Sequence, residues 1–258
     1  MEFVENRIGD EPVYHCVDPA VFTVDSLLTD EECSHMINVS KPFMKSSLVS
    51  TADKGVESIG RTSSNAWIKH DHDEITQQIG EKIANIVGLP LENAEAYQVI
   101  YYGPGGEYRP HYDSWVHDGS EKTLRCMKYG GARLKTALVY LNDVEEGGST
   151  SLDRLNLDVQ PKKGKLLVFE NTYSESNIKH PLSLHAGMPV IKGEKYAFNL
   201  WFKECNSKKL YSEFNPEYYK TEDTSQSINK YTQLTKLDGF TKISEDKQIY
   251  KLEQMLDE

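Results

Sequence analysis

The sequence has few cysteines and no long apolar segment. Its 258 residues include four cysteines, none of which stands in a C-x-x-C pair: Cys16, Cys33, Cys126 and Cys205. This spacing excludes zinc-ribbon and thioredoxin-like motifs, and scattered cysteines fit a reducing compartment. No run approaches the roughly 18 apolar residues of a membrane span. The acidic start lacks the apolar core of a signal peptide, so we expect a cytoplasmic protein with no membrane partner.

The sequence also has fewer basic than acidic residues. The chain carries 29 Lys and Arg residues against 40 Asp and Glu residues, which gives a formal net charge of −11. Proteins that bind nucleic acid non-specifically need a basic surface, so this balance predicts no nucleic-acid partner. The turn at 145–148 lacks the G-K-[ST] that completes a phosphate-binding loop. The acidic balance is compatible with a neutral or basic peptide as partner.

Hydrophobic periodicity predicts two helices ahead of a β-rich region. The helix over about 29–41 begins at Thr29, which opens a capping box, and the helix over about 71–88 has an apolar stripe with a period near 3.6. From about 96 to 203, short runs of β-branched and aromatic residues alternate with turn clusters. Strands at this spacing form barrels or sandwiches, so we expect a mainly β fold with supporting helices.

The same patterns divide the chain into three segments. We expect a lead-in over 1–19, one domain over 20–205, and a polar tail over 206–258. The tail is predicted to be partly helical, because Ser244 is a suitable N-cap for an apolar stripe that ends near Leu256.

One short motif indicates a metal site. His111-Tyr-Asp113 is the only H-x-D in the sequence, and residues i and i+2 of a strand point to one face, so both side chains can reach one ion. His185 lies far downstream beside further β structure and can supply a third ligand. Two histidines and one carboxylate form a facial triad that leaves positions open on a non-haem Fe(II).

A second set of residues suits a dicarboxylic oxoacid. Lys195 follows His185 by ten residues at the start of the last strong β run. A fixed cation at that place can anchor the far carboxylate of an oxoacid that chelates the metal. The neutral side chains of Tyr102 and Thr150 can donate hydrogen bonds to the same carboxylate.

These residues stand in ordered blocks that resemble the prolyl 4-hydroxylase branch of the Fe(II)/2-oxoglutarate dioxygenases. The matching blocks are 61–64, 98–106, 108–113, 131–136, 140–148, 184–189 and 195–201, within a match over about 20–202. The resemblance implies a double-stranded β-helix, or jelly-roll, core. A lysine ten residues after the second histidine is typical of prolyl hydroxylases, whereas related lysyl hydroxylases and nucleic-acid demethylases generally have an arginine there.

The resemblance also implies a role for each matching residue. His111, Asp113 and His185 match the iron ligands. Lys195 matches the anchor of 2-oxoglutarate, assisted by Tyr102 and Thr150. The residues that match those lining the peptide site are Tyr108, Arg133 and Trp201. No catalytic residue beyond the metal centre is implied.

The implied activity is 4-hydroxylation of prolyl residues in a peptide or protein. The cosubstrates would be 2-oxoglutarate and O2, the products succinate and CO2, and ascorbate is expected to restore enzyme lost to uncoupled turnover. Two alternatives stay open: a hydroxylase of another side chain or free amino acid, and a non-catalytic peptide-binding barrel. Lys203, which stands where many members have histidine, leaves the choice of substrate open.

A second histidine-rich stretch has a simpler interpretation. His70-Asp-His72-Asp-Glu74 resembles a metal cluster, but it lies at the start of the predicted helix over 71–88. Acidic residues in the first turn stabilise a helix through its dipole, so we interpret this stretch as a helix cap.

Overall fold

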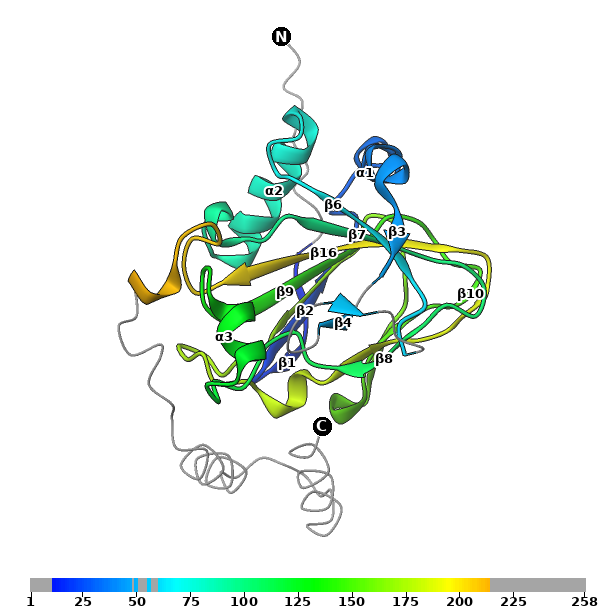
Figure 1. Cartoon of the computed structure of the whole chain (residues 1–258). Helices are drawn as coiled ribbons and strands as arrows, with labels where there is room; N and C mark the ends of the chain where they lie inside the picture. Colours follow the sequence, from blue (N-terminus) through cyan, green and yellow to red (C-terminus); the bar gives the residue numbers. More distant parts are fainter. Residues whose placement is uncertain (1–10, 48, 51–54, 57–59, 214–258) are drawn as a thin grey trace. The chain divides into compact units, whose positions relative to one another are not determined.

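A large antiparallel sheet forms the centre of the computed structural model, which describes residues 11–47, 49–50, 55–56 and 60–213 (Figure 1). Its eight strands, in spatial order, are β1 (Val13–Val17), β2 (Ala20–Val24), β13 (Leu166–Glu170), β9 (Arg133–Tyr140), β16 (Lys195–Lys203), β7 (Tyr97–Tyr102), β6 (Ser64–Ile68) and β3 (Lys45–Ser46). Strands distant in sequence are therefore neighbours in the sheet, as in a jelly roll.

A smaller sheet packs against one face of the large one. Its four strands, in spatial order, are β12 (Leu157–Val159), β11 (Thr150–Leu152), β14 (His185–Gly187) and β8 (Tyr108–His111). Two further pairs are β10 (Glu146–Gly147) with β15 (Val190–Lys192), and β4 (Val49–Ser50) with β5 (Gly55–Val56). One buried cluster joins Leu138 and Ala197 of the large sheet to Leu152 and Val159 of the small one, so these two sheets enclose a common core.

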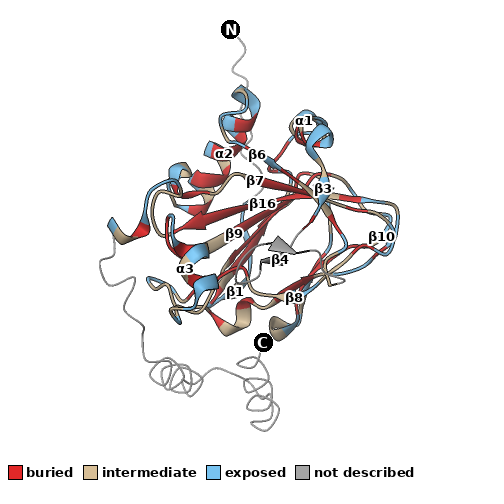
Figure 2. Cartoon of the chain, viewed as in Figure 1, coloured by how far each residue is buried: buried red, intermediate tan, exposed pale blue. Residues whose placement is uncertain are grey.

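Helices α1 (Asp30–Ser40) and α2 (Glu74–Val87) cover the opposite face of the large sheet (Figure 1). The α-helices are α1 (Asp30–Ser40), α2 (Glu74–Val87) and α3 (Glu121–Met127), and the short 3₁₀ helices are η1 (Lys41–Phe43), η2 (Leu91–Asn93), η3 (Asp153–Leu155), η4 (Pro181–Ser183) and η5 (Tyr211–Glu213). Met36 of α1 and Ile83 of α2 share a buried cluster with Val99 of β7. In Figure 2, the inner strands β7, β9 and β16 of the large sheet are coloured mainly as buried.

The side chains of β7 alternate between these two cores. Tyr97 and Val99 belong to the cluster that includes the helices, whereas Ile100 and Tyr102 belong to the cluster between the sheets. Because strand side chains alternate in direction, this register sends Tyr102 and its cross-strand partner Lys195 toward the small sheet.

The two predicted helices are confirmed, and each begins at a capping box. The Thr29 side chain accepts the backbone N–H of Glu32 at the start of α1. Asp73 accepts the backbone N–H of Thr76 at the start of α2, which ends at Gly88 with φ of 75°. The acidic stretch near residue 73 therefore serves as a helix cap, as the sequence predicted.

The structure extends the domain beyond both predicted boundaries. Part of the predicted lead-in, β1, pairs with β2 and forms an edge of the large sheet. Part of the predicted tail packs on the domain, because Tyr211 is fully buried beside Met127 and Ala132 and hydrogen-bonds Glu204. The helix predicted after Ser244 lies outside the described residues. Among the residues that are described, no helix is long and apolar enough to span a membrane.

Candidate active site

Three side chains, on or just beyond strands of the small sheet, meet at one point. Strands β8 and β14 are antiparallel neighbours, and their register sets His111 directly opposite His185. Asp113 lies just beyond the end of β8, rather than on the strand itself as the sequence predicted. One ligand atom from each of the three residues lies within 4.8 Å of the others. The sequence-predicted triad is therefore assembled in the fold.

Backbone carbonyl groups orient both imidazole rings. The Nδ1 atom of His111 is 2.8 Å from the carbonyl oxygen of Arg109, and the Nδ1 atom of His185 is 2.8 Å from that of Ser183. Each Nε2 atom then faces the Asp113 carboxylate, at 3.7 Å for His111 and 3.5 Å for His185. A carbonyl acceptor on one ring nitrogen leaves the lone pair of the other nitrogen for a metal.

Two hydrogen-bond donors hold the Asp113 carboxylate, and the sequence did not predict that they act together. Its Oδ2 atom accepts a hydrogen bond from the Thr136 hydroxyl at 2.7 Å and another from the Trp201 indole N–H at 2.8 Å. The Asn171 amide donates to the Thr136 hydroxyl at 2.8 Å. Asp113 is only 5% exposed, so these bonds fix the orientation of a buried carboxylate.

Electrostatics favour the protonation states that bind a metal. Burial, together with the nearby His185, lowers the pKa of His111 to about 3. Burial by itself raises the pKa of Asp113, but His185, His111 and further donors outweigh it and bring the value to about 2. Neutral imidazole and ionised carboxylate are the forms that coordinate metals, and this donor set suits Fe(II).

We expect Thr136→Val to weaken Fe(II) binding by roughly tenfold, because loss of a hydrogen bond to a liganding carboxylate costs about 10- to 100-fold in metal affinity. The lower end applies since Trp201 still holds the same oxygen. Fe(II) titration under anaerobic conditions measures the effect. Thr23→Val is the matched control, because Thr23 is a buried threonine of the same sheet whose hydroxyl bonds His15. Equal Fe(II) affinity in the two variants would contradict the prediction.

Lys195 is a buried cation beside the triad sheet. It is 2% exposed, and its Nζ donates to the backbone carbonyl of Gly148 at 2.6 Å. Burial alone lowers its pKa to about 7; no carboxylate in the described part of the chain offsets it. A buried ammonium without an anion is costly, so this position fits a group that brings its own carboxylate.

Of the two residues predicted to assist Lys195, Tyr102 lies beside it and Thr150 is connected to it through Tyr140. Tyr102 is its cross-strand partner, with Nζ 5.8 Å from the centre of the Tyr102 ring. Thr150 lies on β11 beside β14, and its hydroxyl bonds the Tyr140 hydroxyl at 2.8 Å. Tyr140, whose ring centre is 5.3 Å from Nζ, was not predicted from the sequence. Tyr140 stands four residues after Thr136 on β9, so the alternation of strand side chains puts both on the same face of the sheet. That spacing is the sequence feature from which its inward position could have been inferred.

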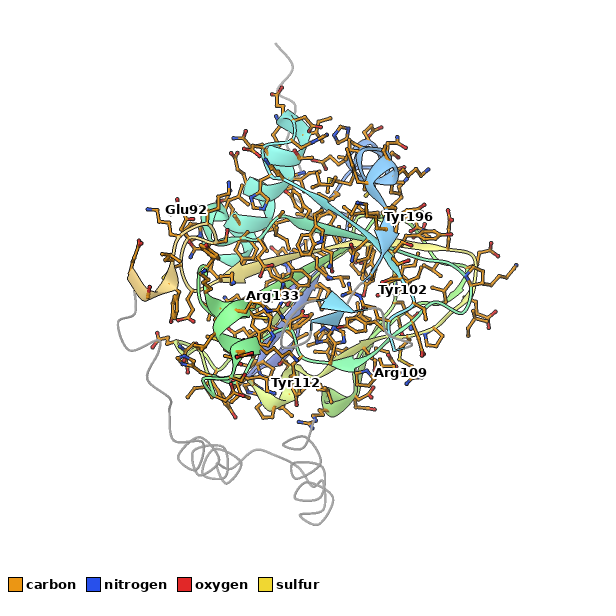
Figure 3. All side chains as sticks on the ribbon, viewed as in Figure 1. Glu92, Tyr102, Arg109, Tyr112, Arg133 and Tyr196 are labelled. Carbon is orange, nitrogen blue, oxygen red and sulfur yellow. The ribbon has the colours of Figure 1, made fainter. Side chains whose placement is uncertain are left out.

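The residues predicted to line a peptide site are all near the triad but differ in how they are held. Tyr108 stacks on the His111 ring, with ring centres 3.6 Å apart and planes at 23°. Trp201 contacts Asp113 through its indole N–H. Figure 3 labels Arg133, at the start of β9, and Tyr102, at the end of β7.

Arg133 has partners within the protein. Its Nε and Nη2 atoms donate to the two carboxylate oxygens of Glu95 at 2.6 and 2.8 Å, and its guanidinium lies 3.6 Å from the centre of the Trp201 ring. Arg133 is thus an internal clamp that supports Trp201, and Glu95 is a site residue that the sequence did not indicate. A direct contact between Arg133 and a peptide stays a prediction.

The comparisons with known proteins agree with this geometry. Residues 97–203 match the family model of the 2OG-Fe(II) oxygenase superfamily. The chain is 36% identical over 206 residues to the probable prolyl 4-hydroxylase 8 of Arabidopsis thaliana, a match that covers 72% of this chain and 69% of that protein. It is also 36% identical over 184 residues to a putative prolyl 4-hydroxylase of Acanthamoeba polyphaga mimivirus, over 71% of this chain and 74% of that protein. The chain belongs to the prolyl 4-hydroxylase family.

A solved structure extends the agreement to the fold. The viral collagen prolyl hydroxylase of Paramecium bursaria Chlorella virus-1, in its 2OG complex, is 29% identical with a TM-score of 0.56, over 70% of this chain and 94% of that one. The predicted jelly-roll core is therefore confirmed. The chain is a 2-oxoglutarate-dependent dioxygenase whose cofactor is Fe(II). A role for ascorbate stays a prediction.

Proposed function

We propose that this enzyme hydroxylates prolyl residues at C4 in a peptide or protein substrate. The observation that carries the proposal is the meeting of His111, Asp113 and His185 beside a buried lysine, Lys195, in a member of the prolyl 4-hydroxylase family. The named relatives support proline as the residue that is modified. The open alternative is hydroxylation of another side chain or of a free amino acid at the same site.

The residues of the chain divide into those that hold the cofactors and those that hold the substrate. When bound, Fe(II) and 2-oxoglutarate supply the oxidation: O2 places one oxygen atom on the prolyl C4 and the other in succinate, and CO2 leaves. His111, Asp113 and His185 would hold the iron. Lys195 would bind the far carboxylate of 2-oxoglutarate with a charge-assisted hydrogen bond, and burial excludes competing water.

Aromatic residues beside the triad would hold the prolyl ring. Tyr108 lies flat on the His111 ring, and Trp201 bonds the Asp113 carboxylate. Flat aromatic side chains next to two iron ligands offer an apolar surface close to the metal. The Arg133–Glu95 pair keeps Trp201 in place. These residues position the substrate, and the bound groups perform the oxidation.

The direct test combines two measurements on the purified protein with Fe(II), 2-oxoglutarate and a library of proline-containing peptides. We expect succinate release that depends on iron and peptide, together with a mass gain of one oxygen on proline. Fragment spectra and comparison with 4-hydroxyproline locate the hydroxyl. Oxygen on another residue, or succinate release that requires a free amino acid, would favour the alternative hydroxylase. No oxidation of any proline-containing peptide would contradict the proposal. A cytoplasmic location stays a prediction that cell fractionation checks.

A further inference from the structure

Asn171 is a fully buried polar residue that directly follows the last residue of β13. Its relative exposure is 0%, and its backbone N–H donates to the carbonyl of Leu134 on β9 at 2.8 Å. Phe169, two residues earlier, belongs to the core between the two sheets, and its ring centre is 4.6 Å from that of His185. Asn171 is therefore held between β13 and β9, close to the iron ligands.

The side chain of Asn171 sets the direction of a hydrogen-bond chain that ends on Asp113. Its Nδ2 atom donates to the Thr136 hydroxyl at 2.8 Å, and that hydroxyl donates to the Asp113 Oδ2 atom at 2.7 Å. A hydroxyl has a single proton to donate, so an N–H donor behind Thr136 leaves that proton for the carboxylate. Successive hydrogen bonds of this kind polarise and strengthen one another. Asn171 therefore acts on the orientation of Asp113 through Thr136.

The backbone of Asn171 is bonded to the segment that orients a second iron ligand. Its carbonyl accepts the backbone N–H of His180 at 2.8 Å and the Ser183 hydroxyl at 3.4 Å. Ser183 belongs to η4, and its own carbonyl oxygen lies 2.8 Å from the Nδ1 atom of His185. One residue thus connects the groups that support Asp113 with the groups that support His185.

The oxygen of the same amide adds little to the stability of the fold. The Oδ1 atom of Asn171 has no hydrogen-bond partner among the residues that the structure describes. A buried acceptor without a partner is destabilising, whereas an apolar side chain of similar shape avoids that cost. Packing by itself would therefore favour leucine at this position, and the amide is explained by the hydrogen bond that it donates.

We infer that Asn171 is a positioning residue of the iron site, which acts through Thr136 to fix Asp113 relative to His185. Hydrogen-bonded partners behind metal ligands orient those ligands and contribute to metal affinity. The inference concerns how the chain holds Fe(II), so it does not depend on which substrate residue is hydroxylated.

The test is a double-mutant cycle in Fe(II) affinity, measured by anaerobic titration of the full-length protein without peptide. Asn171→Leu should weaken Fe(II) binding by roughly two- to tenfold, the range that one neutral hydrogen bond provides. In the Thr136→Val background the same substitution should cause no further loss, because the hydroxyl that carries the effect is absent. A purely structural role of Asn171 would lower Fe(II) affinity equally in both backgrounds.

Asn93→Leu is the matched control. Asn93 is 8% exposed, and its amide donates to the backbone carbonyls of Lys203 and Glu204, at 3.3 Å each, rather than to Thr136 or an iron ligand. This variant should retain wild-type Fe(II) affinity. Melting temperature shows that each variant is folded, and Asn171→Ala takes the place of Asn171→Leu if the larger side chain prevents folding.

Wild-type Fe(II) affinity in Asn171→Leu overturns the inference, and so does a loss of equal size in the two backgrounds. If neither Asn171→Leu nor Asn171→Ala folds, Asn171 is required by the fold itself and the inference is overturned as well. Because the titration contains no peptide, each of these results leaves the proposed prolyl hydroxylation standing. A failure of every peptide to react would likewise leave the role of Asn171 at the iron site standing.

Discussion

Replacing either histidine of the triad with alanine is expected to reduce 2-oxoglutarate turnover to background. His111→Ala or His185→Ala leaves two ligands for Fe(II), and two ligands neither retain the ion nor set its open positions. The fold should survive, because both residues lie on short strands of the small sheet and the main apolar cores do not depend on the imidazole rings. Succinate release measures turnover, and anaerobic Fe(II) titration measures the loss of the metal.

A nearby histidine outside the triad provides the control. His72→Ala changes a side chain that is 40% exposed near the cap of α2, and it should retain wild-type turnover. If His111→Ala or His185→Ala keeps near-wild-type succinate release while bound iron is unchanged, the metal site has been assigned to the wrong residues. If an alanine variant loses turnover together with a large fall in melting temperature, the test is repeated with His111→Gln and His185→Gln, because glutamine is closer to histidine in volume.

The triad could be predicted from the sequence because its members stand in recognisable local patterns. His111 and Asp113 are two residues apart, and His185 begins a short β segment. The hydrogen bonds that fix Asp113 could not be predicted in the same way. Thr136 and Trp201 are 23 and 88 residues away from Asp113 in the chain, and only the order of strands in the sheet brings them to one carboxylate oxygen.

The partner of Arg133 could not be predicted from the sequence either. A single arginine in a β run has the appearance of a surface charge or a ligand contact, and the resemblance assigned it to the peptide site. The structure pairs it with Glu95, which is 38 residues away. Burial raises the pKa of Glu95, but Arg133 and Lys203 outweigh that effect and lower it below the usual value, so the pair is charged. The pairing of β1 with β2 and the packing of Tyr211 on Met127 and Ala132 are tertiary contacts as well, and local sequence patterns do not predict them.

Lys195→Ala is expected to weaken the apparent affinity for 2-oxoglutarate by roughly 10- to 100-fold. A charge-assisted hydrogen bond to a buried carboxylate contributes about 1.5–3 kcal/mol, and each 1.4 kcal/mol is about tenfold in affinity. Fe(II) affinity should not change, because Lys195 bonds the Gly148 carbonyl and none of the three ligands. Lys192→Ala is the matched control: Lys192 is a neighbouring lysine whose side chain is 70% exposed and pairs with Glu145. If Lys195→Ala binds 2-oxoglutarate with wild-type apparent affinity, Lys195 does not anchor the cosubstrate.

The buried position of Lys195 also sets how 2-oxoglutarate binding depends on pH. Without the cosubstrate its pKa is lowered to about 7, so below that pH the amine is already charged and binding needs no proton. Above it, the neutral amine must take up a proton as the carboxylate enters, because the bound carboxylate raises the pKa of the lysine. We therefore expect the wild-type affinity for 2-oxoglutarate to fall above pH 7 by up to about tenfold per pH unit. In Lys195→Arg the guanidinium stays charged throughout, so binding should be weaker but should lose this pH dependence. An equally steep decline in the arginine variant would show that another group titrates.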